Sequence, residues 1–225
     1  MSPFFKSVAV VLMVILGNVL TGYPQTYRLK SNTFFYHAPW KDSLYRFPKF
    51  QEGRMIFDRG VSSDRKWQMN YNIYLKRMEM ITERGDTIGV DYSSAITVII
   101  IANHLFFNDY PDGFIEILIE GNVSLGAKHG VKVLMEDGNG ERFRATDWGP
   151  DMTSRFDRLF TKEDLYYFLD QKSKVRPANR RWILKLFPEQ KEQIRSYLVK
   201  NYINFKVAVD LESLLNFCNN NSPQQ

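Results

Sequence analysis

The chain has 225 residues, with 30 Lys and Arg against 25 Asp and Glu, which gives a formal net charge of +5. Apolar residues make up 44% and charged residues 24%, proportions that exclude a disordered or collagen-like chain. Cys218 is the only cysteine, so a fold held by internal disulfides is excluded as well. The length fits one domain, or one domain with a small appendage, and 15% aromatic residues favour β-sheets.

The first 22 residues have the pattern of a secretory signal peptide. Lys6 is the only charge before residue 28, and a thirteen-residue apolar stretch runs from Val8 to Leu20. A bilayer-spanning helix needs about 20 apolar residues, so this stretch is too short to span comfortably. We therefore expect cleavage after Gly22, export to the periplasm or cell surface, and no transmembrane span in the mature chain. A retained N-terminal anchor, or a buried first helix, is the alternative.

Residues 23–170 are predicted to form a β-rich body. Residues 67–75 alternate, with an apolar face predicted to be buried and a polar face of Gln68, Asn70 and Asn72; the apolar face comprises Trp67, Met69, Tyr71, Ile73 and Leu75. Residues 96–107 and 113–125 each indicate a hairpin, with turns at 102–104 and 120–122. Short strands with closely spaced turns and no helix between them predict an antiparallel meander that hides its edges in a sandwich, roll or barrel.

Residues 171–218 are predicted to form a basic helical segment, before a polar tail at 219–225. Residues 165–177 look like a last strand or short hairpin. Asn179 is a plausible helix N-cap, and Pro188 suits the first position of a second helix. Leu211, Leu214, Leu215 and Cys218 form the apolar stripe of a third helix. The fold class is therefore α+β, with two to three short helices after the meander.

Two blocks of sequence resemble a known group of proteins. They are GFIEILIEGNVSL at 113–125 and LFPEQKEQIRSYLVKNYINFKVAVDLESLLNFC at 186–218. Both are similar to a broad group of uncharacterised exported proteins from Bacteroidota, in which a β-rich body precedes short C-terminal helices. The resemblance implies export and this layout, and it supplies no active site.

Metal-binding chemistry has little support in the sequence. His37, His104 and His129 are isolated from one another and from any ligand spacing, so we predict solvated turn histidines, although three scattered histidines could converge in space. Residues 137–141 place oxygen-bearing side chains as at the start of a calcium loop. Arg142 stands where such a loop needs glycine, so a hairpin turn is predicted instead. No metal ion or other cofactor is expected.

Catalytic chemistry is equally hard to place. The sequence holds no Gly-x-Ser-x-Gly elbow and no phosphate-binding glycine motif. Cys218 lies on the apolar stripe of the last helix without a neighbouring His or Lys, which predicts a buried structural thiol. Asp109, Asp112 and Glu116 are close in sequence, but turn and surface roles are expected for them. No residue is assigned as catalytic.

The strongest departure from an ordinary composition is the charge of residues 171–206. Ten Lys and Arg residues stand there against Glu189 and Glu192, a net +8, which leaves −3 on the rest of the chain. Export makes a nucleic-acid partner improbable, so an anionic envelope component (phospholipid, lipopolysaccharide or acidic glycan) or an acidic protein is the better candidate. The cations expected to share one patch are Arg180, Arg181, Lys185, Lys191 and Arg195. Alternatively, they are simply the solvated faces of two helices.

Together these patterns predict an exported, non-enzymatic binding or structural scaffold of the cell envelope or periplasm. The alternative is a hydrolase of envelope or extracellular polymers that works through loop carboxylates. A cleft lined by convergent carboxylates or histidines would favour the hydrolase. A smooth body with one large basic or apolar face would favour the binding protein.

Overall fold

The computed structural model describes residues 26–31, 41–63, 65–90, 94–144 and 156–220. The expected signal peptide at 1–22 and His37 lie outside the described residues, as does the end of the polar tail.

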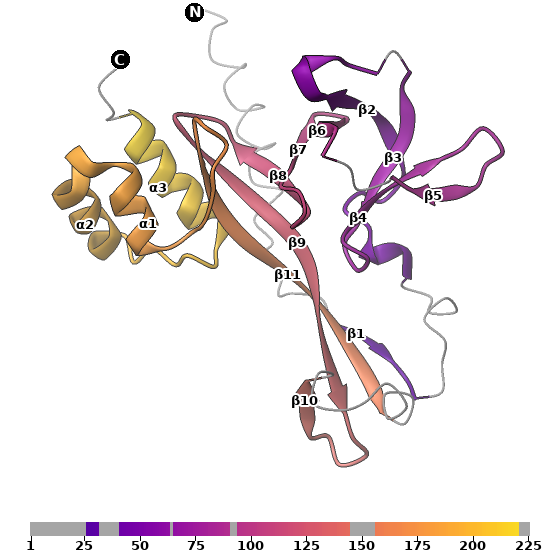
Figure 1. The fold of residues 1–225 in the computed structure, drawn as a ribbon. Helices are drawn as coiled ribbons and strands as arrows, with labels where there is room; N and C mark the ends of the chain where they lie inside the picture. Colours follow the sequence, from indigo (N-terminus) through magenta and orange to yellow (C-terminus); the bar gives the residue numbers. More distant parts are fainter. Residues whose placement is uncertain (1–25, 32–40, 64, 91–93, 145–155, 221–225) are drawn as a thin grey trace, which may run out of the picture.

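The described strands form one 12-stranded antiparallel sheet, in the order β1-β11-β9-β8-β7-β6-β2-β3-β4-β5, with β10 paired to β9 and β12 paired to β11 (Figure 1). This arrangement confirms the predicted meander and the α+β class. The strands are β1 (Thr26–Leu29), β2 (Gln51–Phe57), β3 (Trp67–Asn72), β4 (Arg77–Ile81), β5 (Thr87–Gly89), β6 (Ile96–Ile101), β7 (His104–Asn108), β8 (Phe114–Ile119), β9 (Val123–Glu136), β10 (Arg142–Arg144), β11 (Asp157–Asp170) and β12 (Val175–Pro177).

The turns between strands follow the predicted signals. The β6–β7 hairpin turns at Ala102 and Asn103, as expected, and Ala102 takes a positive φ of 51°. In the β9–β10 turn the Asp137 carboxylate accepts hydrogen bonds from the backbone N–H groups of Asn139 (2.9 Å) and Glu141 (2.8 Å). This segment is therefore a hairpin turn, as predicted, whose carboxylate is occupied by its own backbone.

The sheet curls on itself. Tyr71 of β3 and Phe106 of β7 are three strands apart in the sheet order, which would separate them by about 14 Å in a flat sheet. Their rings stack with centroids 5.8 Å apart. Tyr71 also lies 6.3 Å from the His129 ring of β9, five strands away. The curl encloses the first apolar core, built mainly from β2, β3, β6 and β7.

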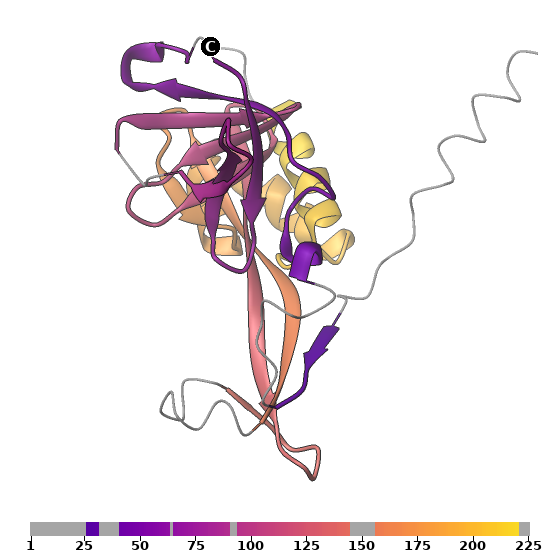
Figure 2. The ribbon, with the colours of Figure 1, turned by 90° about the vertical axis from the view of Figure 1, so that its right-hand side faces the viewer.

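Beyond the curl, β9 and β11 continue as a long two-stranded arm that carries β1 and β10 (Figure 2). Their antiparallel register runs from the Asp157–Glu136 pair to the Asp170–Val123 pair. The same two strands thus bind the curled part of the sheet, the arm and the helices together.

The β3 segment departs from its predicted alternation in two places. Asn70, expected on the solvent face, is 1% exposed, because its side-chain amide pairs with the backbone N–H and C=O of Phe47 (3.1 and 2.9 Å). The chain before β2 therefore covers the second face of β3, and the amide replaces the missing backbone partner. Leu75, expected in the core, is 48% exposed, because β3 ends at Asn72 and Leu75 lies in the turn that follows.

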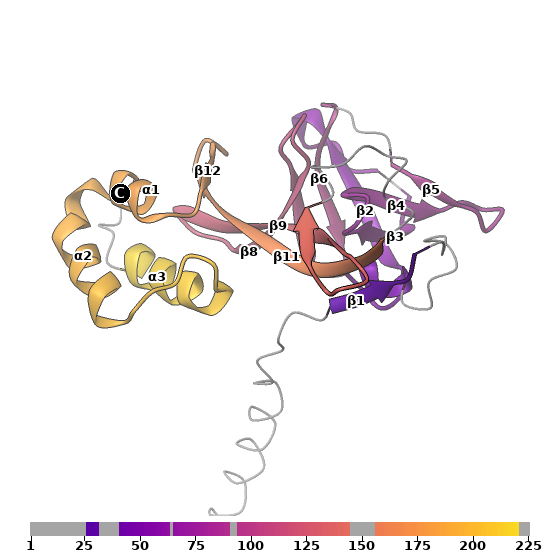
Figure 3. The same cartoon turned by 90° about the horizontal axis from the view of Figure 1, so that it is seen from below.

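The C-terminal helices are α1 (Arg180–Leu186), α2 (Lys191–Lys200) and α3 (Ala208–Asn220). Asn179 caps α1 as predicted, with its side-chain oxygen 3.0 Å from the backbone nitrogen of Trp182. Pro188 starts a short 3₁₀ turn, and α2 follows. We call residues 180–220 the helical cap, which lies at one end of the molecule, with β2–β6 at the other (Figure 3).

The helical cap is docked on the sheet through a second apolar core. The predicted stripe of α3 is fully buried and packs with Val123, Leu125 and Phe168 of the sheet; the stripe consists of Leu211, Leu214, Leu215 and Cys218. The Asn219 side chain pairs with the Val123 backbone on both sides (3.3 and 3.1 Å). Burial raises the pKa of the Cys218 thiol to about 12, as fits the structural role predicted for it.

Candidate functional site

A buried cluster of charged side chains lies where the sheet curls most. Glu116 points inward from β8 and is 1% exposed. Its Oε1 accepts hydrogen bonds from Arg46 Nη2 (3.0 Å) and His104 Nδ1 (2.7 Å). Its Oε2 accepts from Arg46 Nε (2.7 Å) and from His129 Nε2. His129 completes the cluster by donating from Nδ1 to Asp164 on β11 (2.8 Å).

The curl of the sheet is what brings these groups together. Arg46 comes from the chain before β2, and its Nε reaches Glu116, seventy residues further along the chain. Glu116 shares a strand face with Phe114 because the two are two positions apart in β8. A carboxylate on that face must be paired, since burying it alone would be prohibitive.

The pKa values of the cluster follow from this pairing. Burial by itself would raise the pKa of Glu116, but the hydrogen bonds from His129 and Arg46 outweigh it and hold that pKa well below its usual range. Burial by itself would lower the pKa of His129, but Asp164 and Glu116 raise it above its usual value. Glu116 is thus held as a carboxylate and His129 as an imidazolium.

This arrangement leaves the cluster little freedom to react. Each Glu116 oxygen already accepts two hydrogen bonds, and both ring nitrogens of His129 donate to carboxylates. An imidazolium in this state has no lone pair with which to take a proton or bind a metal ion. The charges therefore hold β8, β9, β11 and the segment before β2 in place.

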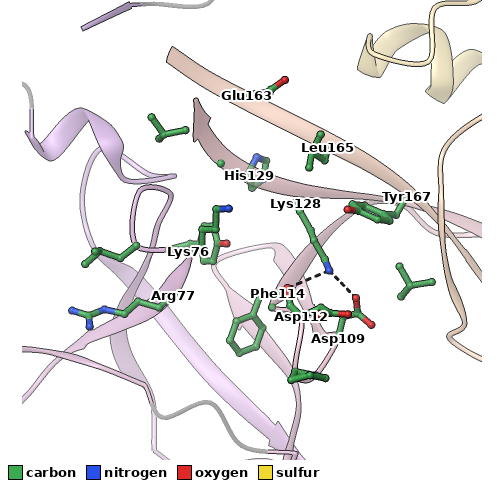
Figure 4. Close-up of a pocket in the computed structure, with 17 residues that line it drawn as sticks. Lys76, Arg77, Asp109, Asp112, Phe114, Lys128, His129, Glu163, Leu165 and Tyr167 are labelled. Atoms are coloured by element: carbon green, nitrogen blue, oxygen red, sulfur yellow. Dashed lines mark hydrogen bonds and ion pairs between the residues drawn. The ribbon is translucent and has the colours of Figure 1, made fainter. Parts of the chain in front are cut away.

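An open cavity of about 810 Å³ lies beside the cluster, and His129 forms part of its wall (Figure 4). The β3–β4 turn, the β7–β8 turn, β9 and β11 supply the other walls. Lys128 points to the β7–β8 turn, with its Nζ 2.8 Å from Asp109 Oδ2 and 3.3 Å from the backbone oxygen of Asp112. Asp112 and Glu163 add carboxylates, and Tyr167 adds an aromatic ring. The cavity is thus lined by charges of both signs.

The structure separates the three carboxylates that are close in sequence. Asp109 and Asp112 line the cavity from the β7–β8 turn, while Glu116 is buried in the ion cluster. Among the described residues, no group of three or more His, Cys, Asp or Glu side chains is arranged to hold a metal ion.

The five predicted patch cations all lie exposed on the helical cap. Arg180, Arg181 and Lys185 are on α1, and Lys191 and Arg195 are on α2. Arg195 pairs with Glu192 at 2.5 Å, with both side chains largely exposed.

Trp182 binds two cations of the basic segment at once. Its ring lies 4.7 Å from Lys185 Nζ and 4.6 Å from Arg176 Cζ. Cation–π contacts of this kind hold the two positive charges at the surface without neutralising them.

The prediction of solvated turn histidines was wrong for two of the three. His104 is the first residue of β7 and bonds to Glu116, and His129 is 8% exposed within β9. Both positions depend on Glu116, which sequence reasoning placed on the surface. The available signal was a glutamate inside the apolar strand 114–119, on the same face as Phe114.

No protein-family model, curated protein or solved structure matches this chain. Among the helices that the structure describes, none combines the length and the apolar character needed to cross a bilayer.

Proposed function

We propose that this chain is an exported, non-enzymatic binding scaffold of the cell envelope, which attaches to an anionic component through its basic helical cap. The observation that carries the proposal is the concentration of exposed positive charge after residue 170. Cations of the body, such as Arg46 and Lys128, contact buried or cavity-lining carboxylates. Residues 171–206 hold ten cations against two glutamates, and the five patch cations are exposed.

The charges in the cap are placed for long-range attraction. Exposed cations that share a surface add their fields, and an anionic polymer or membrane collects the sum. The ion pair between Arg195 and Glu192 reduces this attraction only slightly, since exposed ion pairs are weak and screened by salt. The cap binds with its charge, and the β body supplies the rigid support.

The test compares two variants with the same change of charge. One reverses the five patch cations to Glu: Arg180→Glu, Arg181→Glu, Lys185→Glu, Lys191→Glu and Arg195→Glu. The control reverses five exposed cations of the body: Lys49→Glu, Arg54→Glu, Arg84→Glu, Lys132→Glu and Arg144→Glu. Circular dichroism checks that both variants fold.

Binding is measured to vesicles containing phosphatidylglycerol and to polygalacturonate, from about 10 to about 300 mM ionic strength. The cap variant should lose binding, whereas the body variant should keep at least part of it. Wild-type binding should weaken steeply with salt. A wild-type protein that ignores both probes at the lowest ionic strength contradicts the proposal.

The cavity favours a second candidate function, hydrolysis of an envelope or extracellular polymer. Asp112 and Glu163 line a space large enough for a sugar or peptide unit, and carboxylate pairs carry out glycoside hydrolysis. Loss of a measured hydrolytic activity in both Asp112→Asn and Glu163→Gln, with normal folding, would support it.

A further inference from the structure

One corner of the helical cap exposes apolar side chains that the fold does not cover. Val199 is 67% exposed, Tyr202 89%, Val207 40% and Val209 66%. These four residues, which we call the apolar tip, lie within eleven positions, at the end of α2, in the α2–α3 connection and at the start of α3. Single exposed apolar residues are ordinary, but a gathering of this kind marks a contact surface.

The connection between α2 and α3 turns its side chains in two directions. Ile203 and Phe205 pack against the second core, while Tyr202 and Val207 point outward. Tyr202 takes a φ of +49°, a left-handed conformation that is unfavourable for a residue other than glycine. The fold therefore holds a large aromatic side chain in water at a conformational cost.

Cations alternate with the apolar tip along the sequence. Residues 193–209 contain Arg195, Lys200 and Lys206 and no acidic residue. The next carboxylate, Asp210, accepts a hydrogen bond from the backbone nitrogen of Asn204 (2.8 Å) and is thus drawn into the connection. The valines and the tyrosine are thus interspersed with cations in the sequence, and Asp210 and Glu212 follow them at the start of α3.

We infer that the apolar tip inserts into the surface of an anionic lipid bilayer. Tyrosine is suited to the boundary between headgroups and acyl chains, where its ring is buried and its hydroxyl stays hydrated. Valines bury apolar area there, and each nearby cation gains from the negative surface potential. This inference rests on the proposed function and specifies its partner as a lipid surface.

An acidic protein or glycan would satisfy the cations equally well, but a glycan chain leaves the valines in water. The combination of apolar tip and cations therefore favours lipid. It also predicts a part of the binding that salt does not screen, because burial of apolar area is not electrostatic.

The first test removes the apolar tip without changing charge. The tip variant combines Val199→Gln, Tyr202→Asn and Val209→Gln; Gln suits helices, and Asn tolerates the left-handed conformation at 202. The matched control removes three exposed apolar side chains of the body, Val61→Gln, Leu75→Gln and Ile88→Gln. All proteins are used in their exported form.

Partition onto phosphatidylglycerol vesicles should fall about tenfold in the tip variant and stay near wild type in the control. At about 300 mM ionic strength the wild type should keep residual binding that the tip variant lacks. A tip variant that partitions like the wild type overturns the insertion and leaves the proposed function intact.

The second test reports the depth of the apolar tip directly. Val209→Cys is labelled with an environment-sensitive fluorophore, and Arg84→Cys in the β4–β5 turn is the control; Cys218 is buried and does not compete. A blue shift on phosphatidylglycerol vesicles at residue 209 but not at 84 supports insertion. Equal spectra at both sites overturn it. Binding to polygalacturonate without binding to vesicles overturns the lipid partner alone, and binding to neither probe overturns the proposed function as well.

Discussion

The curled part of the sheet and the helical cap differ in where their charged side chains lie. In the sheet, Glu116 is 1% exposed and is enclosed by Arg46, His104 and His129. In the cap, Arg180, Arg181 and Lys191 lie exposed on helices whose apolar faces are already buried against the sheet. Charge in the first region is needed for the fold. Charge in the second lies exposed to solvent, and in the proposed function it contacts an anionic partner.

The largest expected loss of stability comes from disrupting the contact between the helical cap and the sheet. Leu215 is fully buried between α3 and the sheet. Leu215→Asp buries an unpaired charge and should lower the free energy of unfolding by about 4 kcal/mol. Lys200→Asp, on the exposed side of α2, should change it by about 0.5 kcal/mol or less. Urea unfolding measures both, and equal midpoints would mean that the cap is not docked through α3.

Substitution in the buried charge cluster should lower the free energy of unfolding almost as much. Glu116→Gln leaves the Arg46 and His129 cations without their buried partner, which should cost about 3 kcal/mol. Glu52→Gln removes an exposed carboxylate paired with Lys66 and should cost about 0.5 kcal/mol or less. If the two variants unfold at the same urea concentration, the Glu116 cluster does not stabilise the sheet.

His129 and Glu116 should stabilise the folded protein over different ranges of pH. The pKa of His129 is raised in the folded protein, so its contribution is complete below about 6.5 and is lost as pH rises through the folded value. The pKa of Glu116 is lowered, so its contribution is present above about 4.5 and is lost as pH falls towards the folded value.

The difference in unfolding free energy between wild type and His129→Gln should therefore shrink as pH rises from the ordinary histidine value of about 6.5 into the alkaline range. The five-cation reversal in the helical cap should show no comparable dependence. A His129→Gln difference that stays constant over this range would mean that His129 is neutral in the fold.

The smallest expected effect lies at the start of the helical cap. Asn179 caps α1 through its hydrogen bond to the Trp182 nitrogen. Asn179→Ala should cost about 1 kcal/mol, while Asn179→Ser, which can also cap, should recover most of it. Thermal unfolding of the Ala and Ser variants distinguishes loss of the N-cap hydrogen bond from a general effect of substitution at residue 179.

The sequence was most informative where local pattern alone sets the structure. The turn at Ala102–Asn103, the N-cap at Asn179 and the α3 stripe from Leu211 to Cys218 were all predicted and confirmed. It was less informative at Asn70 and Leu75, because the end of β3 and the segment that covers it depend on the curl of the sheet. It failed at His104 and His129, whose partner Glu116 was expected on the surface.

By itself, then, the sequence determined that an antiparallel β body precedes short helices, which face of α3 is buried, and that the positive charge concentrates after residue 170. These properties depend on periods of two or 3.6 residues and on composition, both of which are local. Only the tertiary structure decided that Arg46, Glu116, His129 and Asp164 meet, and that the valines around Tyr202 stay uncovered. The physical reason is that contacts across a curled sheet, and gaps left between docked helices, depend on how whole elements pack, which no local pattern records.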